Sequence, residues 1–429
     1  MPLLKLTWRY SINLKLLGIG KLKLEVKSKG FKKLIGKFQM KTQVAIIGGG
    51  PAGLLLSEIL HRHGVESVVL EKHSRAYVLS RIRAGVLEQT TVDVLRENGL
   101  ANRMDQDGHA HDGMKIVWAG RESFFIDVKK HVNKRFMAYG QTSIQEDLFA
   151  AADLRRAKVL TEAEDAQPMD VTTDHPYVTF RHNGETVRLD CDYIVGCDGF
   201  HGVSRKSIPT SVLRVFEKEY PFGWLGILSE TPPLPDIVYA NHPRGFALAS
   251  MRSPMLSRYY VQAPLDTKLE DWSDDRFWSE LKSRFPKEMA DAIVTGPSIE
   301  KSIAPLRSFV AEPMRYGQLF LAGDAAHIVP PTGAKGLNLA VSDVFYLSRG
   351  LAAFYNQGSS ALLEGYSDMA LRRVWSSVRT SWYLTNLLHR FPNASDFDQR
   401  TQEFELDYLK SSHHAQAALA EQYAGLPFE

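Results

Sequence analysis

The chain has 429 residues, of which 44% are hydrophobic and 24% are charged. This composition excludes a disordered or fibrous chain, and the length allows two or three domains with cores of their own. The two cysteines, Cys191 and Cys197, exclude a disulfide framework and match no common zinc spacing, so we expect no metal site and two reduced thiols in the cytoplasm. No apolar run approaches the roughly 18–20 residues that a membrane helix needs.

The positive charge is concentrated at the N-terminus. Residues 1–39 hold nine lysines and Arg9 against Glu25; their charge of +9, within a chain total of +3, leaves −6 for the rest. A mildly acidic body does not favour nucleic-acid binding. The segment lacks the features of a secretory or transit peptide, and Met40 begins a natural chain start. We interpret residues 1–39 as a basic extension from a misassigned start or a non-native leader; the alternative is a targeting or surface-binding arm.

The next residues predict a βαβ unit. Residues 43–47 are apolar and rich in β-branched side chains, which is typical of a buried parallel strand. Residues 51–63 carry apolar side chains at helical spacing, with Pro51 near the start, where proline is tolerated. Residues 67–70 predict a second strand, which ends at Glu71.

Three glycines join the first strand to the helix in the pattern Gly48-x-Gly50-x-x-Gly53. In dinucleotide-binding units, the first glycine permits a tight turn, the second lets a pyrophosphate approach the backbone, and the third lets helix and strand pack. The helix N-terminus then faces the phosphates, and an acid placed like Glu71 accepts hydrogen bonds from a ribose. We predict a dinucleotide site; the alternative is a glycine-rich turn in a purely structural unit.

Two later strands each end in an acidic residue beside a glycine. Residues 191–199 end in Asp198-Gly199, and residues 319–327 contain Gly323-Asp324, with a helical pattern from about Gly336. Taken alone, each acidic residue is equally well explained as a cap at the end of a strand, without any role in binding. All three motifs in this order resemble the signatures of the class A flavoprotein aromatic monooxygenases. That resemblance implies that Asp324 holds the ribityl chain of FAD and that Asp198 lies where FAD and a reduced nicotinamide approach.

The remaining pattern divides the chain into regions. Residues 238–242, 245–251 and 257–262 alternate like antiparallel strands, and the pattern after Leu337 is helical almost to the end. We expect an α/β (α+β) fold: a Rossmann-like FAD-binding domain with an inserted mixed-sheet substrate domain and a helical C-terminal region. The expected bounds are 1–39 for the extension, 40–219 and 311–345 for the FAD-binding domain, 220–310 for the substrate domain, and 346–429 for the helical region.

Four longer stretches narrow the resemblance, which covers residues 40–429. Residues 81–89, 220–226, 239–246 and 328–338 are similar to those members of the family that hydroxylate 4-hydroxybenzoate. This similarity implies conversion of 4-hydroxybenzoate to 3,4-dihydroxybenzoate (protocatechuate) with non-covalent FAD, NADPH and O2, through a flavin C4a-hydroperoxide. It also implies a homodimer with contacts in the helical region. The charge distribution and the lack of a long apolar run predict no nucleic-acid or membrane partner. The alternatives are a related hydroxylase of another hydroxylated benzoate, or a flavin-binding module without oxygenase activity.

The residues themselves suit such a substrate. Arg252 can hold a carboxylate bidentately, and Ser250, two residues earlier on a strand, points to the same face. By resemblance these two and Tyr260 bind the substrate carboxylate. By the same resemblance Tyr239 contacts the phenol oxygen, Tyr423 hydrogen-bonds to Tyr239, His111 passes the proton to solvent, and Pro331 presents its carbonyl to the substrate hydroxyl. A phenolate is more electron-rich than a phenol, so hydroxylation requires that the proton be removed.

The resemblance also implies two sets of cofactor residues. For FAD they are Gly48, Gly50, Gly53, Glu71, Arg81, Arg83, Gln141, Asp198, Asp324, Lys335, Gly336, Leu337 and Asn338. For the nicotinamide they are Lys72, Tyr77, Arg81, Arg83, His201, Arg205 and Arg307. Members that use NADPH commonly have arginine where this chain has Lys72, a point charge rather than a planar fork. We therefore expect NADPH, with NADH as a possible second donor.

Overall fold

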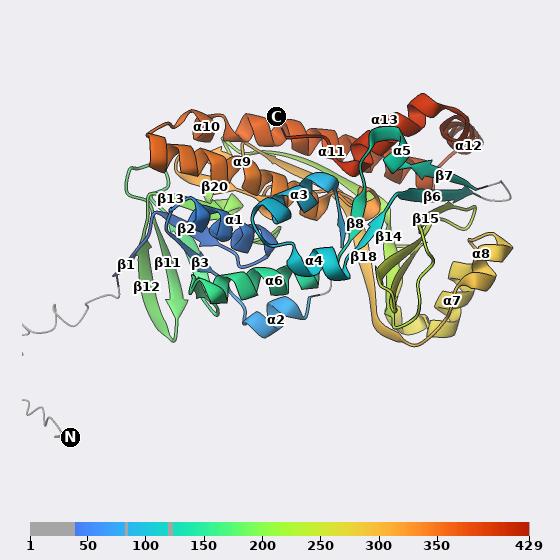
Figure 1. Cartoon of the computed structure of the whole chain (residues 1–429), viewed down its shortest axis with the longest axis horizontal. Helices are drawn as coiled ribbons and strands as arrows, with labels where there is room; N and C mark the ends of the chain where they lie inside the picture. The colour runs from blue at the N-terminus through green and yellow to red at the C-terminus, as the bar shows by residue number, and fades with distance from the viewer. Residues whose placement is uncertain (1–38, 82–84, 119–122, 429) are drawn as a thin grey trace, which may run out of the picture.

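The computed structural model describes residues 39–81, 85–118 and 123–428 (Figure 1). The predictions for residues 1–38 and for Arg83 lie outside the described residues. Within the described part, no helix is both long enough and apolar enough to span a membrane.

A six-stranded sheet forms the centre of one half of the molecule (Figure 1). Its order is β19 (Arg315–Tyr316), β20 (Leu319–Leu321), β13 (Tyr193–Gly196), β2 (Val44–Ile47), β3 (Ser67–Leu70) and β9 (Lys158–Leu160). Every pairing except β19–β20 is parallel. Helix α1 (Pro51–Arg62) joins β2 to β3 and contacts both α6 (Gln141–Leu154) and α9 (Gly336–Gln357). All four residues of β2 are buried, as expected for a parallel strand covered on both faces.

A four-stranded sheet lies beside this unit. Its order is β1 (Gln39–Lys41), β12 (Glu185–Asp190), β11 (Tyr177–His182) and β10 (Glu164–Met169). Strand β1 pairs with β12 in parallel, so Gln39, which we assigned to the extension, belongs to a strand of the folded body.

An eight-stranded sheet occupies the other half (Figure 1). Its order is β21 (His327–Ile328), β18 (Ser298–Glu312), β14 (Arg214–Ser229), β17 (Leu256–Ala263), β16 (Ala247–Ser253), β15 (Ile237–Asn241), β6 (Gly113–Trp118) and β7 (Phe124–Asp127). The sheet therefore extends beyond the expected range of 220–310 in both directions. Strand alternation is a local signal, and it does not reveal that β6 pairs with β15, more than a hundred residues later.

The two faces of this sheet have different neighbours. Val238, Ala247 and Tyr259 face one apolar core, which is closed by α7 (Asp274–Lys282) and α8 (Lys287–Ala292). Tyr239 and Leu248, one residue further along β15 and β16, face the other core, which is closed by α11 (Tyr366–Leu388) and α13 (His413–Ala424). Side chains on a strand point alternately to its two faces. The predicted substrate residues Tyr239, Ser250, Arg252 and Tyr260 therefore share the face that packs against the C-terminal helices.

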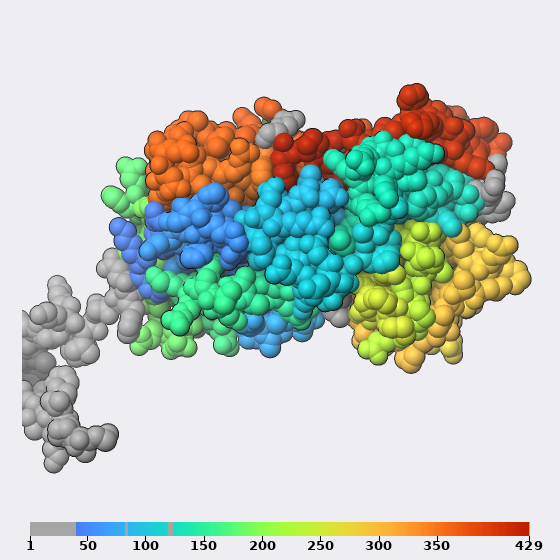
Figure 2. Space-filling model, viewed as in Figure 1, coloured from blue at the N-terminus to red at the C-terminus, as the bar shows by residue number. Residues whose placement is uncertain are grey.

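A short three-stranded sheet connects the two halves, in the order β4 (Val86–Leu87), β8 (Phe136–Ala138) and β5 (His109–His111). The remaining helices are α2 (Arg75–Leu79), α3 (Gln89–Glu97), α4 (Asn102–Asp107), α5 (Val128–Val132), α10 (Ala361–Glu364) and α12 (Asp396–Ser411). Helix α13 packs on α5, and Figure 2 shows the C-terminal residues in red against the teal residues of that region. The end of the chain is thus part of the body of the fold.

His389, directly after α11, lies in an aromatic stack inside the second core. Its ring stacks on Phe222 and Phe246, with ring centroids 4.8 and 4.3 Å away. Its Nε2 accepts a hydrogen bond of 2.7 Å from the indole N–H of Trp224, so Nδ1 carries the proton and donates to the Thr385 carbonyl at 2.9 Å. Burial lowers the pKa of His389 to about 3, and the ring is neutral at neutral pH.

This neutral histidine makes stability depend on pH. The unfolded chain protonates His389 as the pH falls through 6.5, whereas the folded protein resists protonation down to about 3, so stability is lost over that interval. Glutamine carries both a hydrogen-bond donor and an acceptor, and it does not titrate. We expect His389→Gln to lose about 2 kcal/mol less unfolding free energy than the parent between pH 7 and pH 5. Urea denaturation at both pH values measures this difference; the exposed His175→Gln is the control, and equal losses in parent and His389→Gln would refute it.

Candidate functional site

The glycine turn is tightly packed on one side and open on the other. Gly48 has φ +110°, and a Cβ there would lie 2.2 Å from the Cys197 carbonyl oxygen. A Cβ on Gly53 would lie 2.0 Å from the Gly48 carbonyl oxygen. A Cβ on Gly50, the residue before α1, would meet no atom within 4 Å. The turn thus leaves open space at the N-terminus of α1, where backbone N–H groups can bind phosphate.

The Glu71 carboxylate binds the main chain of this turn. One carboxylate oxygen accepts from the Gly49 N–H at 2.7 Å and the other from the His73 N–H at 2.8 Å. The Gln145 amide donates to the Gly49 carbonyl at 2.8 Å. Each oxygen of Glu71 retains an acceptor position, so its contact with a ribose stays a prediction. Gln141 is the half-buried first residue of α6.

The two later acidic motifs lie beside the glycine turn. Strands β2, β13 and β20 are parallel neighbours, so their carboxyl ends meet at one edge of the sheet. One oxygen of Asp198 accepts from the N–H groups of Val203 and Ser204, at 2.7 and 2.9 Å. Its other oxygen is buried and has no hydrogen-bond partner within the described part of the chain. Asp324 is exposed between the buried residues Gly323 and Ala325.

Three of the predicted nicotinamide residues surround Phe200. Arg205 donates to the carbonyls of Ala325 and Phe200, both at 2.7 Å, and thereby links the two acidic loops. Arg307 lies over the Phe200 ring at 5.0 Å and forms ion pairs with Glu217 and Glu219. His201 is exposed. Arg205 is therefore already engaged in holding the site together.

The other predicted nicotinamide residues lie on and beside α2. Lys72 and Tyr77 are exposed, and the Tyr77 ring contacts His73 at 4.2 Å between centroids. The Arg81 guanidinium lies 5.5 Å from the Tyr77 ring centre. The Tyr77 ring thus lies between His73 and Arg81, and Lys72, Tyr77 and Arg81 are all exposed to solvent.

The predicted phenol end is a buried pair of tyrosines. The hydroxyl of Tyr239, on β15, lies 2.8 Å from that of Tyr423, on α13. Both side chains are buried, at 3% and 2% exposure. Burial raises the pKa of Tyr239 to about 12 and the pKa of Tyr423 well above its usual value, so both are neutral at neutral pH. Two neutral hydroxyls can each donate one proton and accept another.

The predicted carboxylate end lies on the same face of the sheet. Arg252 contacts the Ser250 hydroxyl at 3.4 Å, and its Nε is shielded with no partner among the residues described. Burial, and then repulsion by Arg258, lower the pKa of Arg252. A Cβ on Gly226 would lie 2.5 Å from the Tyr260 ring, so this glycine makes room for Tyr260. The arrangement holds a cation beside Ser250, with its Nε meeting no hydrogen-bond acceptor in the part of the chain that the structure describes.

His111 does not continue the tyrosine chain by a hydrogen bond. It is buried, and its Nε2 has no partner in the described residues. Its ring stacks on that of Phe136, with the ring centroids 5.3 Å apart, and the Phe136 ring contacts the Tyr423 ring, with the centroids 5.1 Å apart. Burial, and then His109, lower the pKa of His111 to about 4. The expected proton path is thus a continuous hydrogen bond from Tyr239 to Tyr423. Between Tyr423 and His111 it is interrupted, because the Phe136 ring contacts both residues.

The residues predicted beside the flavin after β21 have other partners. Lys335 is buried, and its ammonium donates to Glu88 at 2.5 Å and to the carbonyls of Gln422 and Tyr423. These contacts use its three donors, so it can act on a neighbouring cofactor by charge alone. Asn338 donates to the Val86 and Ala334 carbonyls and accepts from the Glu88 N–H. Pro331 is exposed, while Gly336 and Leu337 are half-buried.

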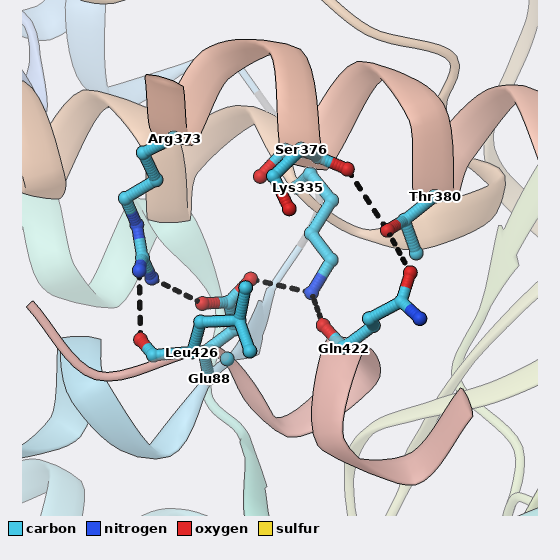
Figure 3. A pocket seen from close by; sticks show the side chains of 9 residues that line it. Glu88, Lys335, Arg373, Ser376, Thr380, Gln422 and Leu426 are labelled. Carbon is cyan, nitrogen blue, oxygen red and sulfur yellow. Dashed lines mark hydrogen bonds and ion pairs between the residues drawn. The ribbon is translucent and has the colours of Figure 1, made fainter. Parts of the chain in front are cut away.

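Sequence reasoning missed Glu88 and Arg373. Figure 3 shows both beside Lys335, with Arg373 donating to Glu88 at 3.0 Å and to the Leu426 carbonyl at 2.7 Å. The partners of Glu88 lie 247 and 285 residues away in the chain. No local pattern indicates such a pairing, although a glutamate in an apolar stretch is an unusual residue to bury.

Comparison with known proteins gives three findings. A family model described as "FAD binding domain" matches residues 41–381. The p-hydroxybenzoate hydroxylase of Acinetobacter baylyi is 52% identical over 392 residues, which cover 91% of this chain and 96% of that protein. The crystal structure of p-nitrophenol 4-monooxygenase from Pseudomonas putida has a TM-score of 0.76 at 18% identity, and the match covers 91% of this chain and 99% of that one. The last likeness is one of fold.

The open space at Gly50 generates a prediction. We expect Gly50→Ala to fold with unchanged stability, because its Cβ meets no protein atom, but to bind the dinucleotide at least about tenfold more weakly, because the methyl group occupies the approach to the backbone. Gly53→Ala is the matched contrast: it should lower the unfolding free energy itself, by about 2 kcal/mol or more. Thermal melts of the apoprotein and titration with FAD separate the two effects; unaltered FAD binding by Gly50→Ala would contradict the assignment.

Proposed function

This chain belongs to the FAD binding domain family and, within it, to the p-hydroxybenzoate hydroxylases, and we propose that it converts 4-hydroxybenzoate to 3,4-dihydroxybenzoate. It is an FAD-dependent monooxygenase. The observation that carries the substrate assignment is the Tyr239–Tyr423 hydroxyl pair on the same sheet face as Arg252, because a para-hydroxybenzoate has a phenol at one end and a carboxylate at the other. Together these residues offer a proton acceptor and a cation.

The residues at the strand ends fit FAD. The open space at Gly50 and the start of α1 suit the pyrophosphate, and the partnerless oxygen of Asp198 and the exposed Asp324 suit polar groups further along the cofactor. Bound FAD supplies the hydride acceptance and oxygen activation that no side chain can perform. The contribution of the protein is to bind, to orient and to exclude water.

At the carboxylate end, Arg252 binds the substrate anion with help from Ser250 and Tyr260. The shielded Nε and the lowered pKa of Arg252 indicate a cation that gains from an anionic partner. A guanidinium matches a carboxylate with two parallel hydrogen bonds, which also fixes the direction of the ring.

At the phenol end, Tyr239 removes the proton. Its hydroxyl accepts the substrate proton while it donates its own to Tyr423, so the charge never enters the apolar interior as a free tyrosinate. From Tyr423 the proton leaves toward His111, and this step needs a water molecule or a side-chain movement past Phe136. Removal of the proton activates the ring carbon ortho to the phenol.

The reductant is NADPH in this proposal, with NADH as a weaker donor. Lys72, Tyr77, Arg81 and His201 are exposed and can meet a ligand from solvent. A lysine binds a 2′-phosphate as a point charge and without the fork of an arginine, so we expect modest discrimination between the two donors. Initial rates with each nicotinamide measure it.

The chain is proposed to form a homodimer in the cytoplasm. Trp382 on α11 and Phe397, Phe404 and Tyr408 on α12 are 45–77% exposed, and a cavity of about 550 Å³ lies between these helices. Large apolar side chains that gather on one surface favour burial against another chain. Light scattering should give twice the chain mass of 48.2 kDa, and a monomer at micromolar concentration would reject the dimer.

The decisive experiment mixes the FAD-loaded protein with NADPH, O2 and 4-hydroxybenzoate and compares 3,4-dihydroxybenzoate formed with NADPH consumed. A ratio close to one establishes substrate, product and coupling together. Rapid NADPH loss that yields mainly hydrogen peroxide would assign the protein to a related substrate. No stimulation by 4-hydroxybenzoate would reject the proposal and leave a flavin-binding module.

Arg252→Met should weaken binding of 4-hydroxybenzoate by about 3 kcal/mol, or roughly 100-fold, because the buried carboxylate loses its cation. The matched control is Arg244→Met, since Arg244 pairs with Glu280 at an exposed position. Flavin fluorescence titration with the substrate measures both dissociation constants. Similar affinities for the two variants would remove Arg252 from the carboxylate pocket.

Tyr239→Phe should still oxidise NADPH but direct most of it to hydrogen peroxide, with product per NADPH at least about tenfold lower, because the substrate keeps its phenolic proton. Tyr259→Phe is the control, because Tyr259 is equally buried but faces the opposite side of the sheet. Quantifying product and peroxide in the same reaction tests the role; tight coupling in Tyr239→Phe would exclude it.

A further inference from the structure

The last residues of the chain run over a buried cluster of charges. Glu88 has 4% exposure, and its two carboxylate oxygens bind Lys335 at 2.5 Å and Arg373 at 3.0 Å (Figure 3). Two cations against one anion leave an excess positive charge within this triad. Such an excess is stable in a buried place only if further acceptors surround it.

Those acceptors are main-chain carbonyls that follow or end α13. Lys335 donates to the carbonyls of Gln422 and Tyr423, at 2.5 and 3.1 Å. Arg373 donates to the Leu426 carbonyl at 2.7 Å, and Lys134 donates to the Gly425 carbonyl at 2.7 Å. The last carbonyls of a helix have no partner within the helix, and cations stabilise that end. The cations of the cluster therefore donate to the carbonyls at and after the end of α13, and these carbonyls in turn stabilise the buried positive charge.

The segment passes very close to the cluster. Gly425 has φ +95°, and a Cβ there would lie 2.3 Å from a carboxylate oxygen of Glu88. We call residues 422–426 the C-terminal clasp. Their main-chain carbonyls accept hydrogen bonds from Lys335, Arg373 and Lys134, and Gly425 lets the main chain lie against Glu88. Tyr423, whose hydroxyl meets Tyr239, belongs to this clasp.

We propose that Arg373 is a positioning residue for the hydroxylation: by binding Glu88 and the Leu426 carbonyl together, it fixes the clasp and thereby holds the Tyr423 hydroxyl in line with Tyr239. This inference rests on the proposed function, because it concerns the same proton path. The hydrogen bond of 2.8 Å between the two tyrosines tolerates a displacement of only about 0.5 Å before it is lost. Arg373 touches neither tyrosine hydroxyl and acts through the main chain.

Two variants disturb the clasp by different means. Arg373→Met removes the donor to Leu426 and leaves Glu88 paired with Lys335, while Gly425→Ala pushes the segment away from Glu88 without removing a charge. Arg244→Met is the control, because Arg244 is exposed and pairs with Glu280 on α7, outside the clasp. All three are made in the full-length, FAD-loaded protein.

The first readout does not depend on catalysis. Hydrogen–deuterium exchange followed by mass spectrometry should show faster exchange of residues 422–428 in Arg373→Met and Gly425→Ala, and the parent rate in Arg244→Met. Unaltered exchange in both of the first two variants would overturn the clasp, whatever the reaction of the protein proves to be.

The second readout asks whether the clasp acts through Tyr423. We expect Arg373→Met and Gly425→Ala to lower product per NADPH about fivefold, the ratio that corresponds to one lost hydrogen bond. In a Tyr423→Phe background neither change should lower it further, because the hydroxyl they position is gone. An equal further loss in that background would overturn the positioning role. A parent protein that forms no product refutes the proposed function, whereas the exchange result still decides the clasp.

Discussion

A single hydrogen bond, 2.8 Å long and buried, joins Tyr239 on a central strand of the large sheet to Tyr423 on the last helix. The two residues are 184 positions apart in the chain, so this contact requires the sheet, the helical region and the chain end to be in register together. A hydroxyl that loses its partner in such a place pays the full desolvation penalty. The fold around it can be understood as the means of keeping this pair aligned and dry.

Burial has opposite consequences at the two ends of the sheet face. At the phenol end it raises the pKa of both tyrosines, which keeps them neutral and able to exchange protons. At the other end it lowers the pKa of Arg252, which makes the cation gain more from an anionic ligand. Trp224 and the neutral His389 fill the space behind with apolar surface and one internal hydrogen bond. One sheet face thus carries two neutral hydroxyls at one end and a cation at the other.

Features that depend on residues close together in the sequence were predicted correctly, whereas most contacts between distant residues were not. The glycine turn, the strands on each side of α1 and the start of α9 were predicted to within a residue or two, because turn chemistry and periodicity are local. The bond between Tyr239 and Tyr423 was predicted by resemblance, and it is present. Glu88 and Arg373 escaped notice, since a charged residue bound by partners hundreds of positions away leaves no trace in its neighbours. The placement of His111 behind Phe136 was equally invisible.

Local pattern was sufficient to predict a dinucleotide-binding βαβ unit and to identify which strand residues share a face, because both follow from the spacing of glycines and apolar side chains along a few residues. Long-range pairing alone settled the rest: that β6 and β7 complete the large sheet, that Arg205 ties the two acidic loops together, and that the chain end lies over a buried charge cluster. These arrangements depend on the burial of charges and the closing of cores between distant segments. Their free energy belongs to the assembled fold, so no short stretch of sequence encodes it.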